Sequence, residues 1–235
     1  MTNLIKTEGI IINKKDIGDF DRIITMFTGG FGKIDILIKG IRKSRKRDKL
    51  GSDVLSFSRT VVYKKENSFV GSTVETIKSY ENIRRDMKKI GMVLYMFHVL
   101  NNILTDSERK TVLYDLTLKS LDYIDREENI SNCILLVIYY LNKIIGEEGI
   151  KFIIQGGRNF SVKNSVISEE LYSDTIKLSR EEYHIIESIY FNKVKELLQE
   201  STDVKDLYSV LSIYERYLNY HMELCLDFKN YILEA

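Results

Sequence analysis

The sequence of 235 residues contains no proline, only two cysteines and only three histidines. Two cysteines, Cys133 and Cys225, are too few for a four-cysteine zinc site or for the disulfide framework of a small secreted protein. Both lie in apolar helical patterns, so we expect buried thiols. The absence of proline, together with 15 tyrosines and abundant Lys, Ile and Asn, indicates a compositional bias and predicts no function.

Catalytic motifs are also missing. His98, His184 and His221 lie far apart in helical patterns, where a lone histidine is more often structural than catalytic. No HExxH, GxSxG or CxxC sequence occurs. The segment from Phe27 to Ile34 is similar to a phosphate-binding loop, but it lacks the first glycine and the Ser/Thr that binds Mg²⁺, so a hairpin turn is the better interpretation. We expect no enzymatic activity, no cofactor and no bound metal.

The chain has no long apolar run. Its two most apolar stretches, Met92–Leu100 and Cys133–Ile145, are shorter than the roughly 20 residues that span a bilayer. The N-terminus lacks a basic region followed by an apolar segment, so a secretion signal is not indicated. These observations predict two core helices and a cytoplasmic protein.

Five short stretches rich in β-branched and aromatic residues predict strands in the first 80 residues. They lie at residues 9–12, 22–27, 33–38, 57–63 and 69–77. Glycine turns at residues 18–19 and 29–32 and a polar turn at residues 64–68 separate them. Five such strands suit a small closed barrel of either the OB type or the SH3-like type, and the pattern does not distinguish the two.

From about residue 82 the apolar repeat becomes helical. Helices are predicted from Ile83 to Ile103, at 112–124, at 133–145 and at 204–225, with Ser131 as an N-cap and a capping box at Ser179 and Glu182. Residues 147–178 interrupt the pattern and predict a loop and a β-hairpin turning at Lys163-Asn164. The predicted fold class is α+β, with a five-stranded barrel domain at 1–80 and a helical-bundle domain at 81–235.

Positive charge is concentrated near the N-terminus of a chain whose net charge is only +1. Residues 1–50 carry 12 basic and 6 acidic side chains, a net charge of +6, whereas the other 185 residues carry 23 and 28, a net charge of −5. The run Lys39–Lys49 alone holds seven basic residues and one acidic residue. This asymmetry predicts that the N-terminal domain faces a polyanion.

A nucleic acid would neutralise the mutual repulsion of these cations and release counterions on binding. The alternative is a solvated lysine-rich loop. Phenylalanines 20, 27 and 31 lie among the basic residues and either stack on bases or fill the barrel core, with Phe31 the best stacking candidate. The candidate DNA-binding residues are Lys14, Lys15, Arg22, Phe31, Lys33, Lys39, Arg42, Lys43, Arg45, Lys46, Arg47 and Lys49.

Several of these segments together resemble the N-terminal signature of the bacterial DNA repair protein RecO family. They are Gly9-Ile-Ile-Ile12, Ile17-Gly-Asp-Phe-Asp-Arg-Ile-Ile-Thr-Met-Phe-Thr28, Gly32-Lys33 and Lys39-Gly-Ile-Arg-Lys43-Ser-Arg45. The last predicted helix, with Glu215-Arg-Tyr-Leu-Asn-Tyr-His221, is similar to that family's C-terminal helix. Order and spacing agree over about 40 residues of the N-terminal signature.

The resemblance implies an N-terminal OB fold, a helical C-terminal domain and the role of a recombination mediator. Such a protein binds single- and double-stranded DNA, anneals complementary strands and works with RecR in the nucleoid-containing cytoplasm. With RecR it helps RecA to displace single-strand-binding protein. The helical domain of family members contacts the acidic tail of single-strand-binding protein.

One region departs from the family pattern. Many RecO relatives carry four cysteines of a small zinc module in the helical domain, whereas residues 147–178 of this chain contain neither cysteine nor histidine. We therefore expect no zinc, and a fold held by the hairpin and by packing of Phe152, Phe160, Val166 and Ile167. The alternative function is a protein-interaction adaptor whose helical domain is the main functional surface.

Overall fold

The computed structural model describes residues 4–65 and 68–231. The chain divides into two compact units, Met1–Asp125 and Arg126–Ala235. The barrel thus shares its unit with the first helices. The domain boundary expected at residue 80 coincides with the end of the barrel. That it separates two functional domains stays a prediction.

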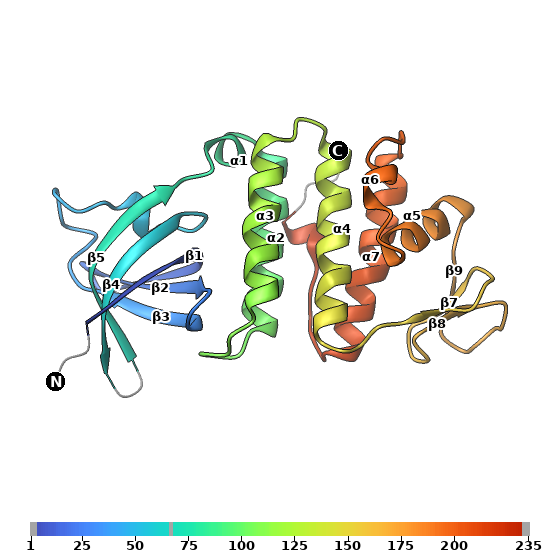
Figure 1. Ribbon diagram of the computed structural model, residues 1–235, viewed down its shortest axis with the longest axis horizontal. Helices are drawn as coiled ribbons and strands as arrows, with labels where there is room; N and C mark the ends of the chain where they lie inside the picture. The colour runs from blue at the N-terminus through green and yellow to red at the C-terminus, as the bar shows by residue number, and fades with distance from the viewer. Residues whose placement is uncertain (1–3, 66–67, 232–235) are drawn as a thin grey trace. The chain divides into compact units, whose positions relative to one another are not determined.

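A closed five-stranded barrel forms the first part of the N-terminal unit (Figure 1). Its strands are β1 (Leu4–Ile17), β2 (Asp21–Thr28), β3 (Gly32–Ile38), β4 (Phe57–Lys65) and β5 (Ser68–Lys78). The order is β1-β2-β3-β5-β4; β3 pairs with β5 in parallel, and antiparallel pairing of β1 with β4 closes the barrel. This confirms the five predicted strands and the OB-type barrel.

The first strand is longer than the sequence pattern predicts. β1 runs on to Ile17, because the polar residues after Asn13 continue to pair with β2 beyond a register shift between Ile11 and Asn13. The glycines at 29–32 form the β2–β3 connection, as expected. The predicted turn between β4 and β5 includes residues 66–67, which lie outside the described residues.

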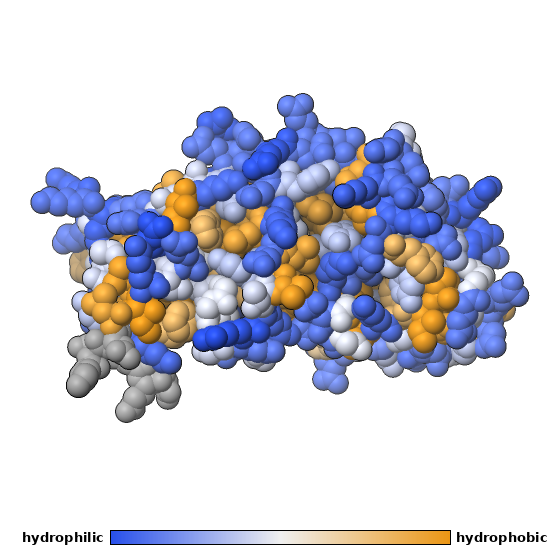
Figure 2. All heavy atoms as spheres, viewed as in Figure 1, coloured by the Kyte–Doolittle hydropathy of each residue, from blue (hydrophilic) through white to orange (hydrophobic). Residues whose placement is uncertain are grey.

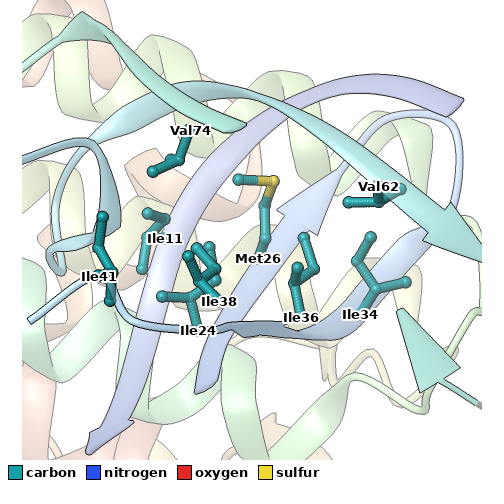
Figure 3. Close-up of a cluster of buried hydrophobic side chains, with 9 residues drawn as sticks. All are labelled: Ile11, Ile24, Met26, Ile34, Ile36, Ile38, Ile41, Val62 and Val74. Atoms are coloured by element: carbon teal, nitrogen blue, oxygen red, sulfur yellow. The ribbon is translucent and has the colours of Figure 1, made fainter. Parts of the chain in front are cut away.

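The barrel interior is filled by apolar side chains, mostly isoleucine and valine, that alternate along the strands (Figure 3). β2 contributes Ile24 and Met26, and β3 contributes alternate isoleucines at 34, 36 and 38. Ile41 joins this cluster although it lies in the basic run after β3, and only 1% of it is exposed. The run is therefore anchored in the barrel core at its beginning.

Three helices complete the N-terminal unit: α1 (Glu81–Arg85), α2 (Met87–Ile103) and α3 (Thr111–Arg126). A short 3-10 helix, η1 (Leu50–Ser52), precedes β4. The single helix expected from Ile83 is wrong, since Asp86 is extended and its carboxylate caps α2 by accepting hydrogen bonds from the backbone N–H of Lys88 and Lys89.

The C-terminal unit contains α4 (Ile130–Glu147), α5 (Arg180–Tyr190), α6 (Val194–Leu197), α7 (Val204–His221) and the 3-10 helix η2 (Phe228–Asn230). α4 and α5 pack against α7. By length and composition α4 could cross a membrane, but half of it is buried within the protein, as is usual for a core helix. On the face drawn in Figure 2 hydrophilic residues predominate and the hydrophobic patches are small.

The helix ends confirm one predicted cap and correct two other predictions. Ser179 and Glu182 form the capping box of α5. The N-cap of α4 is Asn129 and not Ser131, whose N–H donates to the Asn129 side chain. α7 ends at His221, so Cys225 lies beyond it and is exposed, contrary to expectation; Cys133 is buried as expected.

Residues 147–178 form a larger β structure than one hairpin. The strands β6 (Ile153–Ile154), β7 (Asn159–Ser161), β8 (Val166–Ser168) and β9 (Thr175–Lys177) make a sheet in the order β6-β8-β7-β9. The hairpin is β7–β8, and the residues expected to pack it are all buried: Phe152, Phe160, Val166 and Ile167. Within the described part of the chain, no three His, Cys, Asp or Glu side chains are grouped to hold a metal ion.

Candidate nucleic-acid interface

The basic run is the loop that leaves β3 and leads to η1, and we call residues 39–49 the basic loop. Its first turn is fixed to the β1–β2 turn. The N–H of Gly40 donates to Asp21 Oδ1 at 2.7 Å, and the N–H of Arg42 donates to the carbonyl of Phe20 at 3.1 Å. Gly40 has a φ of +66°, a backbone conformation that suits glycine. The basic loop and the β1–β2 turn therefore form one surface.

Asp48 fixes the other end of the basic loop. Its carboxylate accepts hydrogen bonds from Gly51 N at 3.0 Å, Thr76 N at 2.7 Å and Thr76 Oγ1 at 2.6 Å. Burial raises the pKa of this carboxyl, but these hydrogen bonds outweigh burial and hold the pKa below its ordinary value. The one acid of the basic loop is thus occupied by backbone and hydroxyl donors.

Arg47 closes the loop on itself. Its guanidinium donates to the carbonyl of Lys39 at 2.6 Å and to the carbonyl of Ser72 in β5. The hydroxyl of Ser44 accepts hydrogen bonds from the N–H of Lys46 and of Arg47. Because Arg47 is engaged with backbone carbonyls and half-buried, its main contribution is to loop shape.

Arg22 and Arg42 converge on Asp16 at the end of β1. Arg22 Nε donates to Asp16 Oδ1 at 2.7 Å, and Arg42 Nε lies 3.2 Å from Asp16 Oδ2. The hydrogen bond from Arg22, with the charges of both arginines, lowers the pKa of Asp16. Arg22 also lies 3.5 Å from Asp53, which pairs with Lys14. Three of the candidate cations are therefore neutralised locally.

Two other candidates, Lys33 and Phe31, are in contact with the rest of the N-terminal unit. Lys33 Nζ donates to the carbonyl of Asn101 in α2 at 3.2 Å and lies 3.6 Å from Asp106. Phe31 is half-buried against the barrel core, with its ring 6.1 Å from that of Phe69. Both contacts tie these side chains to the protein.

Six of the exposed candidate cations have no acidic side chain within ion-pair distance in the described part of the chain. They are Lys15, Lys39, Lys43, Arg45, Lys46 and Lys49. Five of the six belong to the basic loop. Their uncompensated charge is what phosphates would neutralise.

The outer face of β2 and β3, which binds ligands in many OB folds, is covered near the β2–β3 turn. Phe27 is fully buried, with its ring 5.4 Å from that of Tyr114 in α3. A Cβ at Gly32 would lie 1.9 Å from the carbonyl oxygen of Glu108. The surface open to a polyanion is therefore at the other end of β2, where the β1–β2 turn meets the basic loop.

The structure also presents Phe20 on this open surface. Its side chain is 47% exposed, and Lys43 Nζ lies 4.7 Å from its ring centroid. The sequence pattern favoured Phe31, because Phe31 occupies a glycine turn. The useful signal was the position of Phe20 beside the turn at Gly18-Asp19, far from the covered end of the barrel.

Comparison with known proteins gives one family and several relatives. Residues 1–80 match the family model described as "Recombination protein O N terminal". The chain is 29% identical over 126 residues to the DNA repair protein RecO of Acetivibrio thermocellus, covering 54% of this chain and 50% of that one. It is 31% identical over 150 residues to the DNA repair protein RecO of Mycoplasma capricolum, covering 60% and 58%. The chain spans about half the length of the curated relatives it matches.

Proposed function

Because this chain belongs to the RecO family of DNA repair proteins, we propose that it binds DNA and acts as a recombination mediator. The observation that carries the proposal is the set of five exposed cations on the basic loop. Within this loop, Asp48, Arg42 and Arg47 are held by hydrogen bonds to the protein, while the other cations are exposed to solvent. The loop therefore presents positive charge on the surface. Phosphates along a DNA backbone are the ligand that such a surface suits.

The proposed activity includes annealing of complementary single strands. A cationic surface screens the repulsion between two phosphate backbones, so both strands stay close while base pairs form. This needs no covalent step, and we propose that the protein is not an enzyme. It would bind both single- and double-stranded DNA, since phosphate contacts are common to the two.

The proposed partners follow from the family. With RecR, the protein would help RecA to load onto DNA coated by single-strand-binding protein, whose acidic tail would contact the helical part of the chain. The proposed location is the cytoplasm, in association with the nucleoid.

Binding is tested with fluorescent oligonucleotides of 20 nucleotides, single-stranded and duplex, titrated with protein at several salt concentrations. We expect both to bind, with log affinity falling linearly as log salt rises. The same sample should accelerate annealing of two complementary strands. Affinity that does not change with salt, or no binding to either oligonucleotide, would refute the proposal.

The adaptor function gives a different outcome. In a pull-down from lysate, partners bridged by DNA are lost after nuclease treatment, whereas partners held by the protein remain. Retention of every partner, with no DNA binding by the pure protein, would favour the adaptor.

A further inference from the structure

Phe20 is an exposed aromatic ring in the β1–β2 turn, between Asp19 and Asp21 in sequence and beside Lys43 of the basic loop. Nearly half of its side chain is open to solvent, although burying an aromatic side chain is normally favourable. Within the described residues no other aromatic ring contacts it. The contact with Lys43 leaves nearly half of the side chain open to solvent, where a ligand could cover it.

Hydrogen bonds hold the backbone that carries the ring. The carbonyl of Phe20 accepts the hydrogen bond from Arg42 N at 3.1 Å, and Arg42 Nη1 donates to the carbonyl of Gly18 at 2.5 Å. Lys43 lies over the ring. A platform that is already held in place loses little conformational entropy when a flat ligand stacks on it.

The neighbouring charges identify the ligand. Arg42, which holds Phe20 in place, and Lys43, which lies over its ring, belong to the basic loop, whose exposed cations suit a phosphate backbone. A base-paired duplex keeps its bases stacked on one another, whereas an unpaired base can lie flat on an aromatic ring. The two other phenylalanines near the basic residues are less suitable, since Phe27 is buried in β2 and Phe31 packs on the barrel core.

We propose that Phe20 is a stacking platform for an unpaired base and gives this surface its preference for single-stranded over duplex DNA. The inference rests on the proposed function, because it assumes that the basic loop binds the DNA backbone. The cations then supply affinity for any DNA, and Phe20 adds affinity only where bases are free.

The test compares the 235-residue protein with the variant Phe20→Ala on three fluorescent 20-mers at one salt concentration. These are oligo(dT), a strand of abasic residues that keeps the phosphates but has no bases, and a blunt duplex. We expect the variant to bind oligo(dT) about 5- to 150-fold more weakly, the effect of losing one base–aromatic stack. Its affinity for the abasic strand and the duplex should stay within about twofold of wild type.

Two further variants serve as controls. Phe20→Trp keeps an aromatic face and should retain binding to oligo(dT). Phe191→Ala removes another exposed phenylalanine, 54% exposed in the C-terminal unit, and should leave all three affinities unchanged. Circular dichroism of each variant verifies the fold.

The outcomes separate this inference from the proposed function. Equal weakening of all three ligands by Phe20→Ala, or no weakening of any, would overturn the stacking role while leaving DNA binding intact. If the wild-type protein binds none of the three, the proposed function fails, and the inference with it.

Discussion

Removing the exposed cations of the basic loop should abolish most of the salt dependence of DNA binding. The perturbation replaces Lys39, Lys43, Arg45, Lys46 and Lys49 together by Gln. None of these side chains has an ion pair to lose within the described residues, and Arg42, Arg47 and Asp48, which hold the loop, are kept. The variant should therefore fold normally.

The magnitude follows from counterion release. Each phosphate contact on a single strand contributes about −0.7 to the slope of log affinity against log salt, so five lost contacts reduce the slope by up to about 3.5. A slope of that size corresponds to a fall of roughly 100-fold in affinity for a fourfold rise in salt. The variant should lack this part of the salt dependence of DNA affinity. At low salt it should bind DNA much more weakly than wild type.

The assay is fluorescence anisotropy with a labelled single strand over a series of salt concentrations. The matched control replaces five exposed lysines of the C-terminal unit by Gln: Lys163, Lys177, Lys193, Lys195 and Lys205. Either variant loses five positive charges, so each net charge changes from +1 to −4. If both variants lose the same slope, net charge and not the basic loop governs binding, and the reasoning is refuted.

Three further predictions concern stability, each measured by chemical denaturation. Asp48→Asn should destabilise the protein by roughly 1–3 kcal/mol at pH 7, because the carboxylate accepts three hydrogen bonds. Because the folded-state pKa of Asp48 is lowered, its carboxylate contributes fully to the free energy of unfolding above the ordinary pKa of 3.8, and this contribution is lost as pH falls through the lowered pKa. The difference in stability between Asp48→Asn and wild type should therefore shrink in acid. A difference that stays constant with pH contradicts this. Gly32→Ala should lower the free energy of unfolding by more than about 1–2 kcal/mol, because a left-handed φ of +66° is combined with the close carbonyl of Glu108. Gly18→Ala, at a φ of +53° with open space around the new Cβ, should lower it less. Equal losses of stability in the two variants would exclude a clash with Glu108. Ser179→Ala should cost about 1 kcal/mol by removing the capping box of α5, and an unchanged midpoint would show that the cap contributes nothing.

The barrel could be predicted because its strands alternate between the core and the outside. The isoleucines at 34, 36 and 38 have the period of two that β3 requires, and glycines punctuate the turns. The break at Asp86 was missed because apolar residues continue the helical repeat across it, so only the cap geometry reveals it. The extra strands β6 and β9 are two and three residues long, too short to give a pattern.

The site was predictable in location but not in detail. A concentration of charge along the sequence identifies the basic loop, yet it does not reveal which cations are neutralised. Arg22 and Arg42 both converge on Asp16, and Lys33 reaches α2 across 68 residues of sequence, contacts that depend on the tertiary fold. For the same reason Phe20 and Phe31 could not be ranked until the covered face of β2 and β3 was known.

The most direct test of the central claim is a footprint of lysine acetylation, measured by mass spectrometry with and without a single-stranded oligonucleotide. Bound DNA should protect Lys39, Lys43, Lys46 and Lys49 of the basic loop, while Lys163 and Lys177 of the C-terminal unit should react equally in both states. Unchanged reactivity of the basic-loop lysines, with protection found in the C-terminal unit instead, would contradict the account.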